Sequence, residues 1–510
     1  MSGLPLRNIR DLWDNCVDKW PLKTAVIYEG RSWSYEEADA VIRRLRGALA
    51  GQWGLKKGDR IAIALPNCVE FFFAHWASVH LGAIVVPVNV RLRPDEMRHV
   101  VGGTDSELVI TDAALWPTVE EAIQPLDGVR HVFVVGEAPV GVQAYESLLA
   151  GELEIELPAI SGEDLVLVMH TSGTTGVPKG AMITHENLLF NVKNCLVAHS
   201  WRHEDVHLLV APMFHCTALY SMLPGSAYLG STIVIAPRPD LRELVDLIET
   251  HRITTFIGVP MTFSMLTQMP GLDERDLGSL RSISYAGSPM AARTIKRLRE
   301  KFPGVELRNF FGLTETLSVT HVLPDCDADE RPDSVGKVLP DVGMMIANQD
   351  GEEAPTGEVG ELCLRRENVA QGYWGRPELL EESCFDDWFR TGDLGFVDEQ
   401  GYLYLRGRQK EMIIVGGENV YALEVETCLL ALEGVKEVAV VGVPATGVRE
   451  ALGELIKAVV VAKEGATLTE RDVKRHCVER LSTYKVPHLV EFREELPRNP
   501  AGKVMKRELV

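Results

Sequence analysis

The sequence predicts an α/β protein with two units. The first is a large N-terminal domain of helix-flanked sheets that includes a small β-barrel subdomain, and the second is a small α+β C-terminal domain. Up to about residue 330, short apolar runs alternate with amphipathic stretches at helical spacing; turn-rich short strands follow, and a compact α+β pattern ends the chain. We place the boundary at the change of pattern near "GRQKEM", which gives domains of residues 1–409 and 410–510.

The N-terminal region alternates helix and strand. Residues 35–53 are amphipathic at helical spacing, "DRIAIAL" is a short apolar strand, "VEFFFAHWASVHLGA" is helical and "IVVPVN" is a strand again. The alternation returns in strands "HVFVV", "LVLVMH", "HLLVAP", "STIVIAP", "TTFIGVP" and "SISYAGS", with helices "LRELVDLIETHR" and "MAARTIKRLREKF". Such alternation predicts parallel sheets with helices on both faces and ligands at the carboxyl ends of the strands.

The later segments have a different character. "GEVGELCLRR" and "DWFRTGDLGFVDEQGYLYLRGR" are short strands, and turn residues such as "DEQG" between them predict β-hairpins in a small barrel. The last hundred residues predict helix "ALEVETCLLAL", strands "VKEVAVVGVP" and "LIKAVVVAK", helix "TERDVKRHCVERL" and a final loop.

Composition limits the function classes. The 52 Lys and Arg residues against 73 Asp and Glu residues give a net charge of −21, which argues against a nucleic-acid binder because phosphate backbones would be repelled. No window approaches the roughly 18 apolar residues of a membrane span. "MSGLPLRNIRDLWDN" has no apolar signal core and "KRELV" matches no targeting address, so we expect a cytoplasmic protein.

The nine cysteines have no CxxC pair and no zinc-like spacing, so they are expected to be reduced and mostly buried. Cys216 stands beside His215. We do not favour a nucleophile and base pair there, because adjacent side chains seldom point toward each other.

The stretch "TSGTTGVPKG", residues 171–180, follows the apolar strand "DLVLVMH" and precedes a probable helix near "THENLLFNVKN". A Walker loop needs a hydroxyl residue directly after its lysine, but Gly180 follows Lys179 here. Glycines allow backbone N–H groups to approach an anion, hydroxyls donate hydrogen bonds, and the lysine supplies charge. The loop therefore indicates a phosphate site of another kind.

The loop resembles the signature of the adenylate-forming superfamily, which contains acyl-CoA synthetases, adenylation domains and luciferases. Four further segments agree in order: "RNFFGLTE" resembles the adenine and metal segment, "FRTGDLG" the ribose segment, "GRQKEMIIVGGENVYALEVE" the interdomain hinge and "PRNPAGKVMKREL" the terminal lysine loop. The resemblance implies an ATP-dependent acyl-CoA ligase, most like a bacterial fatty-acid or aryl-acid CoA ligase.

The resemblance also implies the ATP and AMP site. Phe311, where the family commonly has tyrosine, would stack on adenine, and Thr314 would contact phosphate. Asp393 would accept both ribose hydroxyls, with Arg408 on the same ribose or the phosphate. The implied nucleotide-binding residues are Thr171, Ser172, Gly173, Thr175, Gly176, Lys179, Gly287, Ser288, Asn309, Phe310, Phe311, Gly312, Thr314, Asp393 and Arg408.

Catalysis and metal binding are assigned on the same basis. Glu315 would hold Mg²⁺, with Thr174 as a second candidate ligand, because a carboxylate suits magnesium that bridges the triphosphate. Lys503, on a Pro- and Gly-containing loop, would neutralise the substrate carboxylate and the α-phosphate as they meet. The implied catalytic residues are Lys503, Thr174, Glu315 and His215.

Two half-reactions follow. A carboxylate attacks the α-phosphorus of ATP to give an acyl-adenylate and pyrophosphate, and CoA then displaces AMP. Family members rotate a mobile C-terminal domain about a hinge between the steps, so the resemblance implies that this domain is mobile here as well, places the hinge at Lys410 and brings Gly416 and Gly417 to the tunnel for CoA. ATP, Mg²⁺ and CoA are thus the expected cofactors and co-substrates, and the partners are small molecules; a homodimer stays open.

The segment "APMFHCTALY" would border the acyl pocket, where His215 is either a functional group or a core histidine. The remaining expected pocket residues are all neutral, which favours an apolar aliphatic or aromatic acid: Met213, Phe214, Tyr285 and Leu317. Two alternatives remain open, an adenylating enzyme that delivers its acyl group to a carrier protein and an ATPase or phosphotransferase that acts at the γ-phosphate.

Overall fold

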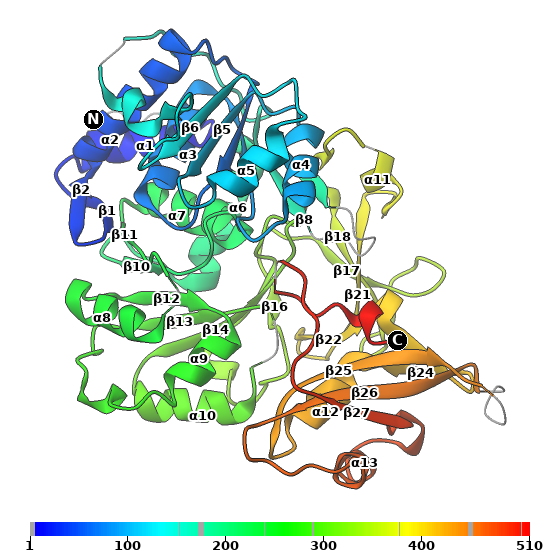
Figure 1. The fold of residues 1–510 in the computed structure, drawn as a ribbon. Helices are drawn as coiled ribbons and strands as arrows, with labels where there is room; N and C mark the ends of the chain where they lie inside the picture. Colours follow the sequence, from blue (N-terminus) through cyan, green and yellow to red (C-terminus); the bar gives the residue numbers. More distant parts are fainter. Residues whose placement is uncertain are drawn as a thin grey trace.

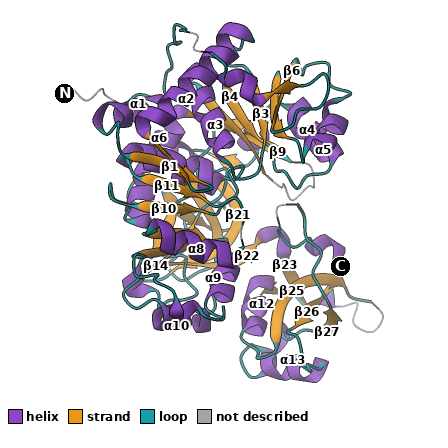
Figure 2. Cartoon of the chain, turned by 60° about the vertical axis from the view of Figure 1, so that its left-hand side comes forward, coloured by secondary structure: helices purple, strands orange, loops and turns teal. Residues whose placement is uncertain are grey.

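The computed structural model describes residues 6–151, 154–171, 178–238, 240–287, 290–376, 378–446, 452–500 and 502–510. Two large sheets with helices around them form the N-terminal part, and a small curled sheet joins them (Figure 1). The last hundred residues form a separate α+β unit, which Figure 2 shows below the barrel strands β21 and β22. This arrangement confirms the predicted fold class.

The first large sheet is parallel in its centre and antiparallel at one edge. Its central strands are apolar on both faces, as expected for strands covered by helices. Three helices flank it: α3 (Val69–Leu81), α4 (Pro94–Gly103) and α5 (Trp116–Ile123). In spatial order the strands are β19 (Gly372–Tyr373), β9 (Lys179–Thr184), β8 (Leu165–Thr171), β4 (Ile84–Pro87), β3 (Arg60–Ala64), β5 (Leu108–Asp112), β6 (His131–Val135) and β7 (Gln143–Ala144).

The second large sheet is also mixed. Its strands in order are β16 (Lys337–Val338), β15 (His321–Leu323), β14 (Glu306–Phe311), β13 (Ser282–Tyr285), β12 (Thr255–Gly258), β10 (Val206–Leu209), β11 (Thr232–Ile235), β1 (Thr24–Tyr28) and β2 (Arg31–Ser34). The five strands from β14 to β11 are parallel to one another. Its helices include α8 (Leu241–His251), α9 (Pro260–Leu266) and α10 (Ala292–Lys301).

One continuous apolar core joins the two large sheets. Helix α3 is buried along almost its whole length, and Phe72 and Trp76 pack there against Trp13. Further helices complete this core: α1 (Arg10–Lys19), α2 (Tyr35–Gly47), α6 (His185–His199) and α7 (Leu223–Leu229). A helix that is apolar on all sides must be surrounded by protein, and the composition of α3 therefore places it between layers.

The barrel subdomain is a curled antiparallel sheet. Its strands are β17 (Met344–Ala347), β18 (Gly360–Arg365), β21 (Trp388–Val397), β20 (Cys384–Phe385) and β22 (Leu403–Arg408), and the short helix α11 (Glu378–Glu381) precedes β20. The "DEQG" turn joins β21 to β22, as the sequence predicted. Strand β22 ends at Arg408, where the 3₁₀ turn η7 (Gln409–Glu411) leads out of the barrel.

The C-terminal unit has its own hydrophobic core. It contains the hairpin β23 (Met412–Val415) and β24 (Glu418–Tyr421), and the sheet β25 (Val435–Pro444), β26 (Glu454–Ala462) and β27 (Leu489–Arg493). Helices α12 (Ala422–Leu430) and α13 (Glu470–Val478) lie on it, and Val425, Val440 and Val473 are among the residues that meet in the centre. The proposed boundary at residues 409 and 410 coincides with the turn η7.

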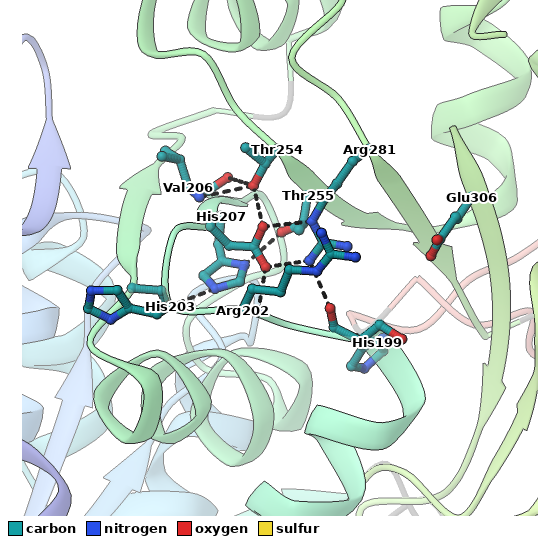
Figure 3. A network of polar contacts seen from close by, with 12 residues as sticks. His199, Arg202, His203, Val206, His207, Thr254, Thr255, Arg281 and Glu306 are labelled. Carbon is teal, nitrogen blue, oxygen red and sulfur yellow. Dashed lines mark hydrogen bonds and ion pairs between the residues drawn. The ribbon is translucent and has the colours of Figure 1, made fainter. Parts of the chain in front are cut away.

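A polar network lies at the amino ends of the parallel strands of the second sheet, opposite the edge formed by their carboxyl ends. Arg281 donates through Nε to Asp205 Oδ1 at 2.8 Å, and Thr254 Oγ1 donates to the same oxygen at 2.8 Å. His207 contacts the hydroxyls of Thr255 and Ser231. Figure 3 shows the labelled members gathered where β10, β12 and β13 begin.

Two predicted elements differ in detail. The helix expected over residues 35–53 is divided into α2 and the π-helical turn η1 (Ala48–Gln52), because the run "ALAGQ" contains a glycine and no longer presents a strictly 3.6-residue apolar face. The sheets are also not purely parallel, because hairpins such as β1–β2 and β8–β9 supply antiparallel strands. No helix in the described ranges is long and apolar enough to cross a membrane.

Candidate active site

The strands on either side of the expected phosphate loop are antiparallel neighbours. Thr171, the last residue of β8, is the register partner of Lys179, the first residue of β9. Helix α6 follows β9 directly, and its N-terminus carries a capping box in which Thr184 and Asn187 bond each other's backbone N–H groups. Five expected site residues, Ser172, Gly173, Thr174, Thr175 and Gly176, lie outside the described residues, and so does Ser288.

A residue that the sequence reasoning missed connects two expected ones. Tyr373, on β19, donates its hydroxyl hydrogen bond to Glu315 Oε1 at 3.0 Å, and the Lys179 ammonium lies 5.1 Å from the centre of its ring. Strand β19 pairs with β9, where Tyr373 is opposite Ala181. The pair "GY" in "QGYWG" was the only available signal, and two residues are too few to predict a strand.

Glu315 lies in a tight loop after β14. Leu317 and Ser318 adopt left-handed backbone conformations with φ values of 63° and 83°, which non-glycine residues rarely adopt and which cluster at functional sites. The backbone N–H of Ser318 donates to the Leu313 carbonyl at 2.9 Å. A side chain at Gly312 would place its Cβ 2.0 Å from the Ser318 carbonyl oxygen, so the loop requires glycine there.

Asn309, Phe310 and Phe311 precede this loop, and they differ in how far their side chains are buried. Phe310 is buried against the ring of His199, with centroids 4.8 Å apart, and Asn309 donates through its side chain to the Ser334 carbonyl at 3.0 Å. Phe311 is half-buried and its ring meets His321 edge-on. Of the three expected nucleotide contacts, only the Phe311 ring is therefore partly free to contact a ligand through its side chain.

The barrel contributes a carboxylate and a guanidinium. Asp393 on β21 and Arg408 on β22 are register partners, and Arg408 Nε lies 2.7 Å from Asp393 Oδ1. Asp393 is buried, and its Oδ2 has no hydrogen-bond partner within the described part of the chain. Burial raises the pKa of Asp393 to about 6, although Arg408 and Lys503 act in the opposite direction. An unpartnered buried oxygen is what a site for ribose hydroxyls requires.

The terminal lysine loop is pre-shaped by its own hydrogen bonds. Asn499 Oδ1 accepts from the Lys503 backbone N–H at 2.9 Å, and the Asn499 N–H donates to the Lys503 carbonyl at 2.9 Å. The loop touches the N-terminal sheets where Asn89 Nδ2 donates to the Pro500 carbonyl at 3.4 Å. In Figure 1 the red C-terminal segment leaves its own unit and reaches the N-terminal sheets.

The charge of Lys503 acts on residues from two other parts of the fold. Its positive charge lowers the pKa of Asp393, and it opposes the rise in the pKa of His215. Groups from the second sheet, the barrel and the C-terminal unit therefore lie close enough for their charges to interact.

His215 and Cys216 do contact each other, contrary to our expectation. The Cys216 Sγ lies 3.5 Å from His215 Nδ1 because the chain turns sharply there, and Thr314 Oγ1 donates to the same sulfur at 3.8 Å. Cys216 raises the pKa of His215. Burial alone would raise the pKa of Cys216, but His215, Thr314 and Ser318 together lower it. The backbone N–H of Thr217 also donates to His215 Nδ1 at 3.3 Å.

The expected acyl-pocket residues are neutral and mostly buried. Met213, Tyr285 and Leu317 are almost inaccessible to solvent, and Phe214 is partly exposed. Met213 is fixed through its backbone N–H, which donates to Asn67 Oδ1 at 2.7 Å. Gly287, beside Tyr285, has a φ of 90° that favours glycine.

The expected hinge and tunnel residues lie in the C-terminal half of the chain. Lys410 is the central residue of η7, between the barrel and β23. Gly416 and Gly417 form the exposed turn between β23 and β24, and both have positive φ values.

The donor set around Glu315 suits a magnesium ion carried by phosphates. Such an ion is a hard cation that takes one or two protein carboxylates and completes its shell with phosphate oxygens and water. Glu315 offers its second carboxylate oxygen, and the part of the chain that the structure describes has no group of three His, Cys, Asp or Glu side chains arranged as a metal cage. Glu315 thus fits the expected role.

Comparisons with known proteins agree with this geometry. Residues 13–374 match the AMP-binding enzyme family, and residues 424–503 match the AMP-binding enzyme C-terminal domain. The long-chain-fatty-acid–CoA ligase FadD13 of Mycobacterium tuberculosis is 34% identical over 93% of this chain and 92% of its own length. The fatty acid–[acyl-carrier-protein] ligase ScoC of Streptomyces coeruleorubidus is 32% identical over 96% of this chain and 93% of its own.

Among solved structures, the anthranilate CoA ligase AuaEII in complex with anthranoyl-AMP superposes with a TM-score of 0.90 at 26% identity, covering 100% of this chain and 98% of that one. The fold and the site therefore define an acid–thiol ligase of the AMP-forming type. The chain belongs to the AMP-binding enzyme family, within the adenylate-forming superfamily, and its homologues act on fatty, aryl and other acids.

Proposed function

We propose that this chain joins an apolar aliphatic or aromatic carboxylic acid to CoA with ATP, through an acyl-adenylate, and releases AMP and pyrophosphate. The observation that supports the proposal is that the Lys503 loop contacts the N-terminal sheets at Asn89 and that the charge of Lys503 acts on both Asp393 and His215. Those two residues mark the expected ribose end and the expected acyl end of an adenylate, and a cation that acts on both suits the meeting of the carboxylate with the α-phosphate.

The first half-reaction brings two anions together. Lys503 would neutralise the reacting oxygens, and the Lys179 ammonium would hold the phosphates that leave as pyrophosphate. Asp393, through its unpartnered Oδ2, would accept the ribose hydroxyls and fix the α-phosphate relative to the acid. A magnesium ion held at Glu315 would supply positive charge to the triphosphate.

The second half-reaction needs the thiol at the same carbonyl carbon. The Lys503 loop occupies the N-terminal face through Asn89, and it must withdraw before a thiol can enter from that side. The turn η7 is a single short connection between two units with separate cores, which suits a hinge at Lys410. Rotation about it would exchange the lysine loop for the Gly416 and Gly417 turn.

The nature of the acid is inferred from the neutral surroundings. Met213, Tyr285 and Leu317 carry no charge, and a second carboxylate buried among them would have no cation to pair with. The named activities of FadD13 and AuaEII cover a long aliphatic and an aromatic acid. These similarities support the class of acid but do not choose between its members.

A substrate panel tests the proposal. The enzyme is incubated with ATP, Mg²⁺ and acids of graded chain length and aromaticity, and pyrophosphate and AMP release are followed with and without CoA. We expect pyrophosphate release with an apolar acid and CoA-dependent AMP release with the same acid. Release of orthophosphate in place of pyrophosphate would reject the ligase and favour cleavage at the γ-phosphate.

A carrier-protein acceptor is the second candidate, because ScoC is named for such a reaction. The same panel separates the two acceptors. An adenylate that forms with a given acid but accumulates in the presence of CoA, without thioester, would favour the carrier protein.

A further inference from the structure

Tyr373 lies between the two phosphate-handling charges of the site. Its hydroxyl donates to Glu315 Oε1 at 3.0 Å, and its ring faces the Lys179 ammonium at 5.1 Å. Glu315 follows β14 of the second sheet, whereas Lys179 begins β9 of the first. One side chain thus contacts a carboxylate and a lysine that come from different sheets.

The backbone around Tyr373 makes this bridge rigid. The Ala370 N–H donates to the Glu315 carbonyl at 2.8 Å, and the Trp374 N–H donates to the Gly180 carbonyl at 2.8 Å. Tyr373 itself is buried, with 7% of its surface exposed. The segment 370–374 is therefore hydrogen-bonded on one side to the Glu315 loop and on the other to the strand that begins at Lys179.

The two contacts of Tyr373 each restrict the position of a charged group. The Tyr373 hydroxyl carries one hydrogen, and it donates this hydrogen to Glu315 Oε1. The hydrogen bond occupies Oε1 and leaves Oε2 as the oxygen available to a metal ion. The ring face holds the Lys179 ammonium by a cation–π contact, which limits where that charge can lie.

We propose that Tyr373 is a positioning residue that aims the Glu315 carboxylate at the magnesium ion of ATP and holds Lys179 at the adjoining phosphates. The inference rests on the proposed function, because it takes Glu315 and Lys179 as the metal and phosphate ligands.

Tyr402 offers a matched control. Its hydroxyl also donates to a carboxylate, Asp327 Oδ2 at 2.7 Å, and its ring also faces cations, Arg331 at 4.0 Å and Lys337 at 4.5 Å. It lies at the far end of the β21–β22 hairpin from Asp393 and Arg408. Tyr402→Phe therefore removes an equivalent hydroxyl without touching the site.

The experiment measures Mn²⁺ binding to the enzyme–ATP complex by electron paramagnetic resonance, with no acid present so that no reaction occurs. We expect Tyr373→Phe to weaken Mn²⁺ binding about tenfold, the effect of losing one hydrogen bond to a charged group. Binding of AMP, which lacks the β- and γ-phosphates, should change less than about twofold. Tyr402→Phe should match the wild type in both measurements.

A double-mutant cycle separates positioning from a general structural effect. Because Tyr373 acts through Glu315, Tyr373→Phe should add little to the loss of Mn²⁺ binding already caused by Glu315→Gln. Losses that add in the double variant, or a Tyr373→Phe variant that binds Mn²⁺ like the wild type, would overturn the inference. A wild-type enzyme that binds Mn²⁺ and ATP normally but releases no pyrophosphate with any acid would instead overturn the proposed function.

The ring is tested with a second substitution, Tyr373→Leu. It removes the contact with Lys179 as well as the hydroxyl, so the affinity for ATP without metal should fall about threefold below that of Tyr373→Phe. Equal metal-free affinities in the two variants would overturn the part of the inference that concerns Lys179.

Discussion

Arg408 Nε lies 2.7 Å from Asp393 Oδ1 across neighbouring strands of the barrel, while the other oxygen of the same carboxylate has no partner among the described residues. Arg408 thus pairs with one oxygen of the buried carboxylate, and the other oxygen is left for a ligand. The burial of Asp393 also affects the stability of the protein, because it raises the pKa of this carboxyl group to about 6 from the ordinary value of 3.8.

The raised pKa of Asp393 sets a pH dependence of stability. The folded state holds this proton more tightly than the unfolded state, so the stabilising contribution is complete below about pH 4 and is lost as the pH rises through about 6. Asp393→Asn removes the titration. We expect the free energy of unfolding of this variant, relative to the wild type, to rise by up to about 3 kcal/mol between pH 4 and pH 7.

Urea unfolding of the ligand-free proteins at closely spaced pH values measures this difference. Both proteins share all other titrating groups, so those effects cancel in the comparison. A difference that stays constant from pH 4 to pH 7 would show that Asp393 has an ordinary pKa in the folded protein.

Lys503→Ala should separate the two half-reactions. The loop places this cation beside Asp393 and His215, so its loss should slow adenylate formation by about a hundredfold or more, as expected when one group that stabilises transition-state charge is removed. Thioester formation from supplied acyl-adenylate should be retained. Lys506→Ala, which removes a nearby lysine bound to Glu411 and Glu426, is the comparison; equal loss in both half-reactions would contradict the assigned role.

Asn89 should act on the first half-reaction through the position of the lysine loop. Its Nδ2 donates to the Pro500 carbonyl, and its Oδ1 accepts from the Arg91 N–H at 3.0 Å. Asn89→Asp keeps the second bond and loses the first. We expect adenylate formation to slow about threefold to tenfold in this variant, the effect of one hydrogen bond.

Pre-steady-state pyrophosphate release gives the rate of that step for the Asn89→Asp variant. Thioester formation from supplied adenylate serves as the internal control, since the proposed function has the loop withdrawn in that step. An unchanged adenylation rate would mean that this contact does not hold Lys503 in place.

Asp205 should be among the most costly residues to remove outside the site. It accepts from Arg281, Thr254 and the Arg202 N–H while almost fully buried, so Asp205→Ala removes a shared acceptor and leaves the Arg281 charge without its carboxylate partner. We expect a loss of about 3–5 kcal/mol in the free energy of unfolding. Asp276→Ala breaks an exposed pair with Arg252 and should cost less than about 1 kcal/mol in the same urea titration. A similar loss of unfolding free energy in the two variants would contradict the expectation that the buried carboxylate matters more than the exposed one.

Much of the fold could be predicted because many of its helices and strands follow from local sequence patterns. The apolar run of β3 and the mostly apolar helix α3 each depend on residues near one another in sequence. The edges of the sheets were harder. A two-residue strand such as β19 has no period of its own and forms only because β9 is already present to pair with it.

A motif can name residues that are expected at the site, but it cannot name the contacts between residues that are distant in sequence. Asp393 and Arg408 stood in recognisable segments, and the structure pairs them. Tyr373 and Glu315 are 58 positions apart, and only the meeting of two sheets makes one the partner of the other. The contact between His215 and Cys216 likewise depends on a backbone turn that the residue types do not specify.

The separate core of the C-terminal unit has a consequence for the kinetics of the enzyme. Val425, Val440 and Val473 meet in a cluster confined to this unit, and the turn η7 is its covalent link to the barrel. The link acts as a tether that makes the arrival of Lys503 an intramolecular event at an effective concentration of about millimolar. A chain cut at this turn would turn the same step into a bimolecular encounter, and the rate of adenylation would then depend on how much of the smaller fragment is supplied.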